Sequence, residues 1–218
     1  MRMRRPSPLG GRRPRRAELA AFATVDSPAV DDLLPDPGCP LRMLIVGVNP
    51  GLWTAAVNAP FAHPGNRFWP SLHAAGLTRR RVDAAAGLLD SDAEDLLARG
   101  VGITNLVGRA SAKASELTRD ELRAGARSLI NRLPELRPRS VAIAGITAFR
   151  QAFDLPRAVL GLQDPALVPG WPRSVRLWVV PQPSGLNAHE NVESLAEKWL
   201  RVWDDSAQDS VADSESPG

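Results

Sequence analysis

Short apolar runs that stop at clusters of turn-forming residues constrain this chain more than any other feature of its sequence. Four such runs lie at about residues 42–48, 101–106, 140–144 and 176–180, and helical stretches separate them. Strands that alternate with helices predict crossover units and a parallel sheet. The sequence therefore predicts an α/β fold built on four parallel strands.

The intervening stretches carry helix signals. We expect helices near residues 66–75, 147–153 and 190–202, and the first and last of these show apolar residues at helical spacing. The segments Ser91-Asp92-Ala93-Glu94 and Thr118-Arg119-Asp120-Glu121 match capping boxes, in which the first and fourth residues cap each other's main-chain N–H groups. A helix is expected after each box.

The two ends of the chain differ in charge from the part between them. Residues 1–16 carry seven arginines and no acid, and residues 204–218 carry five acids and no base. We expect both ends to be disordered, because they can bury little apolar area, and a single domain to span residues 17–203. The arginine-rich end leaves three readings open: a transit peptide, a phosphate-binding arm or a tail without function.

Composition excludes several classes of protein. Cys39 is the only cysteine, so the chain can form no internal disulfide and no cysteine-ligated zinc or iron–sulfur site. No apolar run approaches the roughly 20 residues needed to span a bilayer. The basic N-terminus lacks the apolar segment of a secretory signal. We expect a cytoplasmic protein with no membrane contact.

Turn-forming and polar residues follow each predicted strand. They lie at residues 47–51, at Thr104 and Asn105, at Gly145 and at residues 181–185. The carboxyl ends of parallel strands meet at one edge of a sheet, which is where open α/β sheets bind ligands. The sequence predicts a site at this edge, although residues 47–51 taken alone also fit an ordinary turn.

Three of these segments resemble the mismatch-specific uracil/thymine-DNA glycosylases of the uracil-DNA glycosylase superfamily. They are residues 47–51 (GVNPG), 60–69 (PFAHPGNRFW) and 183–186 (PSGL), and the likeness runs from about Leu41 to Trp199. The resemblance implies a three-layer α/β/α fold with a central four-stranded parallel sheet. It implies a nucleoid-associated monomer whose partner is double-stranded DNA with a mismatched or damaged base.

The resemblance also implies a role for two asparagines. Asn49 matches the catalytic asparagine of that family, and Asn105 matches a position near the bond that is cut. An amide cannot act as a general base, because it does not titrate near neutrality. It can orient a water molecule that captures the sugar cation after the base departs. The bland readings are a turn former for Asn49 and a turn cap for Asn105.

The remaining roles that the resemblance implies concern an extruded base. Such enzymes flip the target base into a pocket, at a cost of a few kcal/mol. The pocket would be formed by Phe61, which would stack on the base, together with Gly47, Val48, Pro50 and Gly51. A core phenylalanine is the alternative for Phe61.

The segment after the last strand matches the part of the family that enters the duplex. Leu186 would be the wedge that fills the gap left by the flipped base. Ser184 would contact phosphate, and the main chain of Gly185 and Asn187 would face the widowed guanine. No metal or cofactor is implied. No Schiff-base lysine is implied either, since Lys113 and Lys198 lie outside the matching motifs.

The sequence does not assign a single role to the other polar residues near these motifs. Asn58 has no assigned role, and His63 is expected to make structural hydrogen bonds. Arg67 fits either a phosphate contact or a brace for its loop. The stretch with Arg109, Ser111 and Lys113 could touch the DNA backbone, with a solvated loop as the default, and His189 is expected to be a surface or capping residue.

The sequence thus favours a DNA glycosylase that flips uracil out of a G·U mismatch and removes it by hydrolysis, which starts base excision repair. Thymine from G·T mismatches and other damaged bases extend this predicted substrate range. Two readings from other classes stay open. One is a non-catalytic module that binds nucleic acid and senses bases. The other is a nucleotide-binding hydrolase, against which the missing GxxxxGK[ST] loop argues.

Overall fold

The sheet of this protein has five strands, four of them parallel. The computed structural model describes residues 4–23 and 28–207. The strand order is β2-β1-β3-β5-β4, and only β4 runs antiparallel to its neighbour. The strands are β1 (Met43–Gly47), β2 (Val101–Asn105), β3 (Ser140–Ala144), β4 (Gly161–Gln163) and β5 (Arg176–Val180).

The predicted α/β class and its four parallel strands are confirmed. The fifth strand, β4, was not predicted, and its three residues explain why. It begins with a glycine, and its side chains are exposed or half-buried, so it carries no apolar run. Pairing with β5 at the edge of the sheet makes it a strand.

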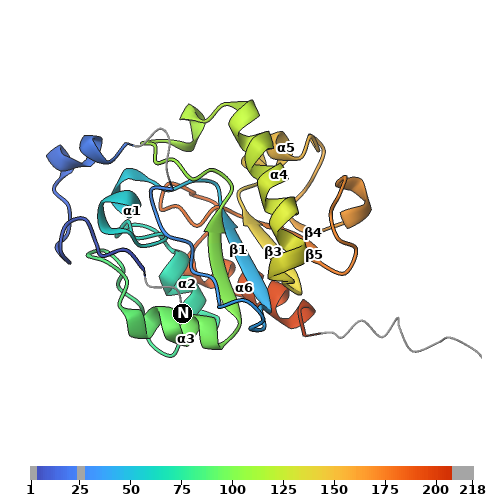
Figure 1. Cartoon of the computed structure of the whole chain (residues 1–218), viewed down its shortest axis with the longest axis horizontal. Coiled ribbons are helices and arrows are strands. Elements are labelled where there is room, and N and C mark those ends of the chain that lie inside the picture. The colour runs from blue at the N-terminus through green and yellow to red at the C-terminus, as the bar shows by residue number, and fades with distance from the viewer. Residues whose placement is uncertain (1–3, 24–27, 208–218) are drawn as a thin grey trace, which may run out of the picture.

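One face of the sheet is covered by α4 (Arg119–Leu136) and α5 (Ile146–Ala152), which lie over the strands in Figure 1. Alternate strand residues point to this face, as the two-residue period of a strand requires. They form a buried cluster with the apolar stripe of α4: Leu44, Val46, Val141, Ile143, Leu177, Val179, Leu122, Ala126, Leu129 and Leu133.

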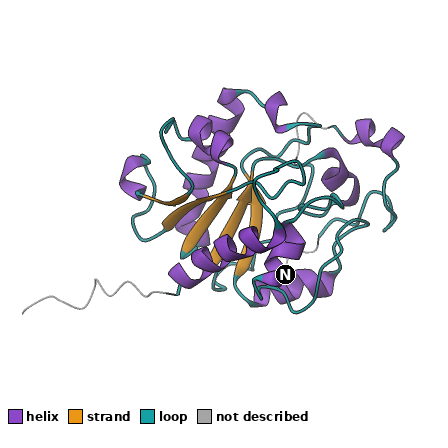
Figure 2. Cartoon of the chain, turned by 180° about the vertical axis from the view of Figure 1, so that it is seen from behind, coloured by secondary structure: helices purple, strands orange, loops and turns teal. Residues whose placement is uncertain are grey.

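The opposite face is covered by α2 (Phe68–Ala74), α3 (Asp90–Ala98) and α6 (Val192–Asp205), and Figure 2 shows helices lying across it. Trp199 of α6 is fully buried there. Its indole N–H donates to Ser71 Oγ at 2.9 Å, and its ring meets that of Phe68 edge to face, with centroids 5.8 Å apart. The helix that begins with the last two residues of the FAHPGNRFW motif is therefore fixed to the core.

The helix signals in the sequence met different outcomes. The capping box at Thr118 is confirmed, because Thr118 Oγ1 accepts from Glu121 N and the Glu121 carboxylate accepts from Thr118 N. The box at Ser91 is wrong, because α3 begins at Asp90 and Leu89 stands at its cap position without a side-chain hydrogen bond. Three short helical elements were not predicted: α1 (Leu52–Val57), η2 (Ala114–Glu116) and η3 (Pro165–Leu167). A further one, η1 (Arg16–Phe22), lies where the apolar residues 19–22 fit either a short helix or an extended segment.

Part of the arginine-rich end, for which we expected disorder, lies against the body. Arg4 donates to the main-chain carbonyl of Asn58 at 2.8 Å and to that of Leu88 at 3.1 Å. Arg13 pairs with Asp83 at 2.8 Å. Burial lowers the pKa of Arg4 from its ordinary value. These contacts give residues 4–23 a defined path across the domain.

The acidic end has a different outcome. Helix α6 runs to Asp205, two residues past the domain end at residue 203 that we expected. The rest of the predicted acidic tail, from residue 208 onward, lies outside the described residues. The division into one domain and two tails stays a prediction.

Gly125 tests how tightly α4 lies on the sheet. A side chain built there would collide with the main-chain carbonyl of Leu106, the residue after the end of β2. We expect Gly125→Ala to lower the free energy of unfolding by about 1–3 kcal/mol, despite the better helix propensity of alanine, because overpacking must displace main chain. Urea unfolding measures this, with Ala124→Ser on the exposed side of α4 as the control. A variant as stable as the parent would contradict the close approach.

Candidate active site

The predicted edge brings three segments of the chain together around Gly47. Gly47 ends β1 and pairs in register with Asn105, which ends β2. A Cβ built on Gly47 would collide with Asn105 Oδ1 and lie 3.3 Å from Cζ of Phe61. The missing side chain of Gly47 is therefore what allows the Asn105 amide and the Phe61 ring to approach the same point.

Phe61 is held in an unusual conformation. Its φ angle of 53° lies in the left-handed region, which costs a residue with a side chain roughly 1–2 kcal/mol. Its ring stacks on that of Phe68, with centroids 3.9 Å apart and planes 22° apart, and the residue is only half-buried. Strain of this kind persists where the surrounding structure imposes it, and it often marks functional sites.

Asn49 lies two residues past Gly47, and its side chain is fixed by the loop that follows β2. Its Nδ2 donates to Ser111 Oγ at 2.8 Å, to the carbonyl of Pro50 at 3.1 Å and to that of Arg109 at 3.2 Å. Within residues 4–23 and 28–207, no group donates a hydrogen bond to its Oδ1. The amide is thus oriented with its nitrogen toward the protein and its oxygen available as an acceptor.

Ser111 is a residue whose part in the site the sequence did not reveal. The sequence favoured a solvated loop for this residue, with a DNA contact left open, but Ser111 is 3% exposed. Its Oγ accepts from Asn49 and donates to the Lys113 carbonyl at 2.8 Å. Ser111 and Asn49 are 62 residues apart, so no local pattern could have linked them.

The hydrogen bonds that Asn49 Nδ2 donates predict how Asn49→Asp changes the stability of the fold. A carboxylate would face the carbonyl oxygens of Pro50 and Arg109 and could donate to neither, so its pKa would rise and the fold would lose stability. We expect a loss of about 1–3 kcal/mol at pH 7 that becomes smaller at pH 4.5, where more of the acid is protonated. Urea unfolding at both pH values measures it.

Asn131→Asp, on the exposed side of α4, is the matched control for the chemistry of that change. It should shift stability by no more than about 0.5 kcal/mol. An Asn49→Asp variant that is equally stable at both pH values would show that the three donor contacts do not fix this side chain.

Arg109 is engaged by the protein, whereas the sequence left open a contact to DNA. Its guanidinium forms a close ion pair with Glu121 and donates to the Glu116 carbonyl at 2.9 Å. The hydrogen bond from Arg109, together with that from the main chain of Thr118, lowers the pKa of Glu121 to about 2. This pair ties the loop that holds Asn49 to the first turn of α4.

The depressed pKa of Glu121 makes stability depend on pH in a defined direction. The folded state favours the ionised carboxylate, so the stabilisation is complete above the ordinary pKa of 4.5 and is lost as pH falls toward 2. Glu121→Gln should lower Tm at pH 7, and the difference from the parent should shrink between pH 4.5 and pH 2. Thermal melts across this range, with Glu135→Gln as a control on the same helix, test this. A difference that does not change with pH would contradict it.

The segment after β5 is displayed at the surface. Leu186 is 96% exposed, and its main-chain N–H donates to Ser184 Oγ at 3.2 Å. Gly185 packs so closely on Gly65 that a Cβ at position 185 would collide with the Gly65 carbonyl. The residue predicted to be the wedge, Leu186, thus projects from a loop that contacts the FAHPGNRFW motif at Gly65.

Arg67 and the neighbouring polar residues have structural partners. Arg67 donates to the main-chain carbonyls of Ser184, Gly185 and Asn187, so it braces this loop. His63 Nδ1 accepts from Gly65 N at 3.0 Å, and His189 is exposed. Asn58 is buried and holds the N-terminal segment, since its Nδ2 donates to the carbonyl of Arg5 at 2.7 Å.

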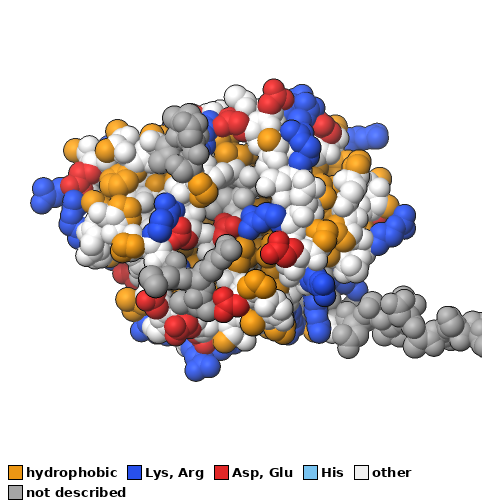
Figure 3. Space-filling view, in the orientation of Figure 1, with side chains coloured by type: hydrophobic (Ala, Val, Ile, Leu, Met, Phe, Trp, Pro, Cys, Tyr) orange, Lys and Arg blue, Asp and Glu red, His pale blue; other side chains and the backbone are white. Residues whose placement is uncertain are grey.

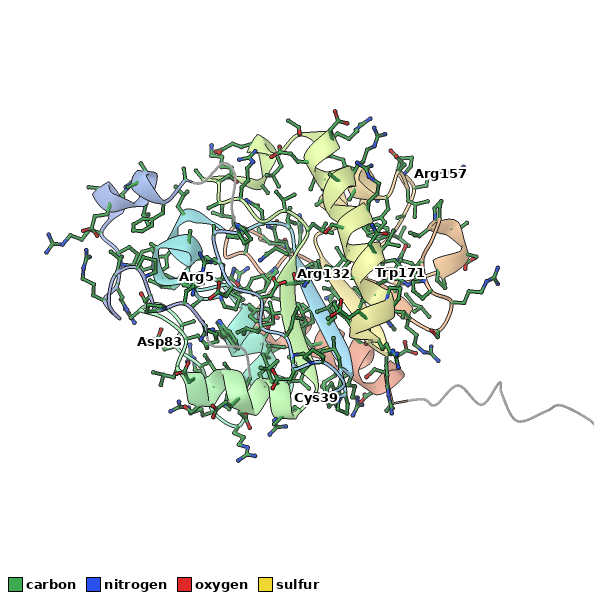
Figure 4. The ribbon with its side chains drawn as sticks, viewed as in Figure 1. Arg5, Cys39, Asp83, Arg132, Arg157 and Trp171 are labelled. Carbon is green, nitrogen blue, oxygen red and sulfur yellow. The ribbon has the colours of Figure 1, made fainter. Side chains whose placement is uncertain are left out.

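A cavity of about 810 Å³ opens on the outer side of β2. Its described lining includes Asn105 and Pro50 but neither Asn49 nor Phe61, so it adjoins the candidate site without being that site. Three of its lining residues, from distant parts of the chain, are labelled in Figure 4: Arg132 near the middle of the view, Arg5 to the left of it and Cys39 below it.

A polar network in this cavity supports the end of β2. Thr104 Oγ1 donates to Asp32 at 2.7 Å and accepts from Arg132 at 3.3 Å, while Arg132 also pairs with Asp32 at 2.6 Å. Thr104 is buried and directly precedes Asn105. The network therefore fixes the backbone from which the Asn105 side chain leaves the sheet.

Three further observations concern the surface charge, the metal-ligating side chains and the apolar character of the helices. On the face in Figure 3, basic and acidic side chains are interspersed rather than gathered by sign. Among the residues that the structure describes, no three His, Cys, Asp or Glu side chains cluster as metal ligands do. In the same part of the chain, no helix has the length and apolar character to cross a bilayer.

A comparison with protein families gives one finding. The family model described as the uracil DNA glycosylase superfamily matches residues 36–205. The matched range contains Gly47, Asn49, Phe61, Asn105 and the loop that bears Leu186. It also contains all five strands of the sheet.

Proposed function

We propose, because the chain belongs to the uracil-DNA glycosylase superfamily, that it removes uracil from G·U mismatches by hydrolysis of the N-glycosidic bond. Thymine opposite guanine is its proposed second substrate. The observation that carries this proposal is the meeting of Gly47, Asn105 and Phe61 at one edge of the sheet, with Asn49 fixed two residues away. A wobble pair is easier to open than a normal pair, which favours mismatched bases.

The extruded base is bound at this edge. Phe61 stacks on it, and such stacking contributes roughly 1–3 kcal/mol. Gly47, Val48, Pro50 and Gly51 supply main chain around the base, and the absent Cβ of Gly47 lets Asn105 and Phe61 come together beside it.

Hydrolysis begins with departure of the base. The bond between N1 of the base and C1′ of the sugar breaks, and the base leaves with the electron pair as an anion. The main-chain N–H groups of Asn49 and Phe61 donate to no acceptor in the described part of the chain, so they are available to this anion. The water oxygen then attacks C1′, and its proton passes to solvent.

Asn49 orients that water through Oδ1, since its Nδ2 is already committed to the protein. Asn105 contacts the nucleotide near the scissile bond. A lyase step is not part of the proposal, because the Lys198 ammonium pairs with Glu190 at 2.8 Å and Lys113 lies on an exposed loop. The enzyme is therefore monofunctional.

The loop after β5 contacts the DNA at the gap that the extruded base leaves in the duplex. Leu186 fills the space that the base vacates, Ser184 contacts a phosphate, and the main chain of Gly185 and Asn187 faces the unpaired guanine. The nearly complete exposure of Leu186 supports this role, because a core residue would be covered.

One assay tests the function and its central residue together. Duplexes with G·U, A·U or G·T and single-stranded uracil are incubated with the protein, and abasic sites are measured under single-turnover conditions. We expect abasic product from G·U, and Asn49→Ala should slow its formation by at least about 10²-fold while duplex binding persists, because the water loses its orientation. Asn131→Ala is the control.

The outcomes separate the candidate functions. Binding without abasic product on any substrate would overturn the enzymatic proposal in favour of a base-sensing module. Equal rates for the parent and Asn49→Ala would refute the role of Asn49 while leaving the enzymatic activity in place.

A further inference from the structure

The side chain of Arg67 is occupied by a single loop that is distant in sequence. Nη1 donates to the carbonyls of Asn187 at 2.8 Å and Ser184 at 3.2 Å, and Nη2 donates to that of Gly185 at 3.3 Å. A guanidinium holds several acceptors in fixed directions, which the single ammonium of lysine cannot do. These three carbonyls surround Leu186 in the chain.

The main chain joins the same two loops. Arg67 N donates to the Pro183 carbonyl at 2.8 Å, and Gly185 lies against the Gly65 main chain without room for a Cβ. Arg67 is also the N-cap residue directly before α2, and Phe68 next to it stacks on Phe61. Arg67 therefore lies between the ring that would hold the base and the loop that would enter the duplex.

The carbonyls of Ser184, Gly185 and Asn187 accept from Arg67, whereas the side chain of Leu186 between them in the chain is left uncovered. Leu186 is 96% exposed although leucine is apolar. Within the loop, the contacts that support this display are short-range: Leu186 N to Ser184 Oγ at 3.2 Å and Asn187 N to Ser184 O at 3.0 Å. The guanidinium of Arg67 supplies the side-chain hydrogen bonds that hold this loop from a distant part of the sequence.

We infer that Arg67 is a positioning residue that couples base capture to insertion of Leu186, and does not bind a phosphate. The inference rests on the proposed function and deepens it. Because the Arg67 side chain adds three hydrogen bonds to the main-chain contacts between the two loops, the wedge and the base pocket act as one rigid unit. Loss of Arg67 therefore impairs opening of a paired base more than cleavage of an unpaired one.

The test compares two substrates and two matched arginines. Uracil is placed opposite guanine in a duplex and, separately, within an unpaired bubble where opening is already complete. Arg67→Met should lower the single-turnover rate on the G·U duplex at least tenfold more than on the bubble, with Arg67→Lys intermediate. Arg150→Met is the control, since Arg150 also holds a main-chain carbonyl, that of Ala158, at 2.7 Å in the last turn of α5.

A double-variant comparison adds a readout that general damage to the fold would not produce. If Arg67 acts through Leu186, then Arg67→Met combined with Leu186→Ala should slow the duplex reaction little more than Leu186→Ala alone. Equal losses on duplex and bubble, or losses that multiply in the double variant, would overturn the inference.

Hydrogen exchange of the free protein tests the contact between Arg67 and the loop of Leu186 without relying on activity. Arg67→Met should speed exchange at residues 184–190 while the strands keep their protection, and Arg150→Met should leave residues 184–190 unchanged. Unchanged exchange in Arg67→Met would overturn the inference even if the enzyme is active. If the parent cleaves no substrate, the proposed function fails, and accelerated exchange would limit Arg67 to bracing the loop.

Discussion

The candidate site depends on the parallel pairing of β1 with β2 and on its continuation past the ends of both strands. Leu106 N donates to Gly47 O, Val107 N to Val48 O and Ser111 N to Pro50 O. These bonds hold the GVNPG turn against the loop that follows β2. Both the approach of Asn105 to Gly47 and the contact of Asn49 with Ser111 follow from this single alignment.

The alignment also explains why polar groups can be buried at this edge. Buried main-chain and amide groups are costly unless they are hydrogen-bonded. Here the carbonyls of Pro50 and Arg109 each accept from Asn49, and the hydroxyl of Ser111 serves both Asn49 and Lys113. The three acceptors around Nδ2 of Asn49 leave the amide little freedom to rotate.

A second constraint acts between the FAHPGNRFW stretch and the loop after β5. The ring of Phe68 is buried beneath Phe61 and against Trp199, so the start of α2 is anchored in the core. Arg67, at that start, reaches the carbonyls around Leu186. The exposed leucine is therefore tied through one arginine to the interior of the protein.

The sequence by itself determined the four parallel strands, the capping box at Thr118 and the edge where the motifs meet, because these depend on local periodicity and turn chemistry. It could not show β4, which is a strand only through its pairing with β5, nor the start of α3 at Asp90. Only the tertiary structure decided that Ser111 holds Asn49, that Asn58 holds the N-terminal segment and that Arg67 braces the loop of Leu186. Each of these contacts joins residues far apart in the chain, and the packing of the sheet and its helices, rather than any short pattern, brings them within hydrogen-bond distance.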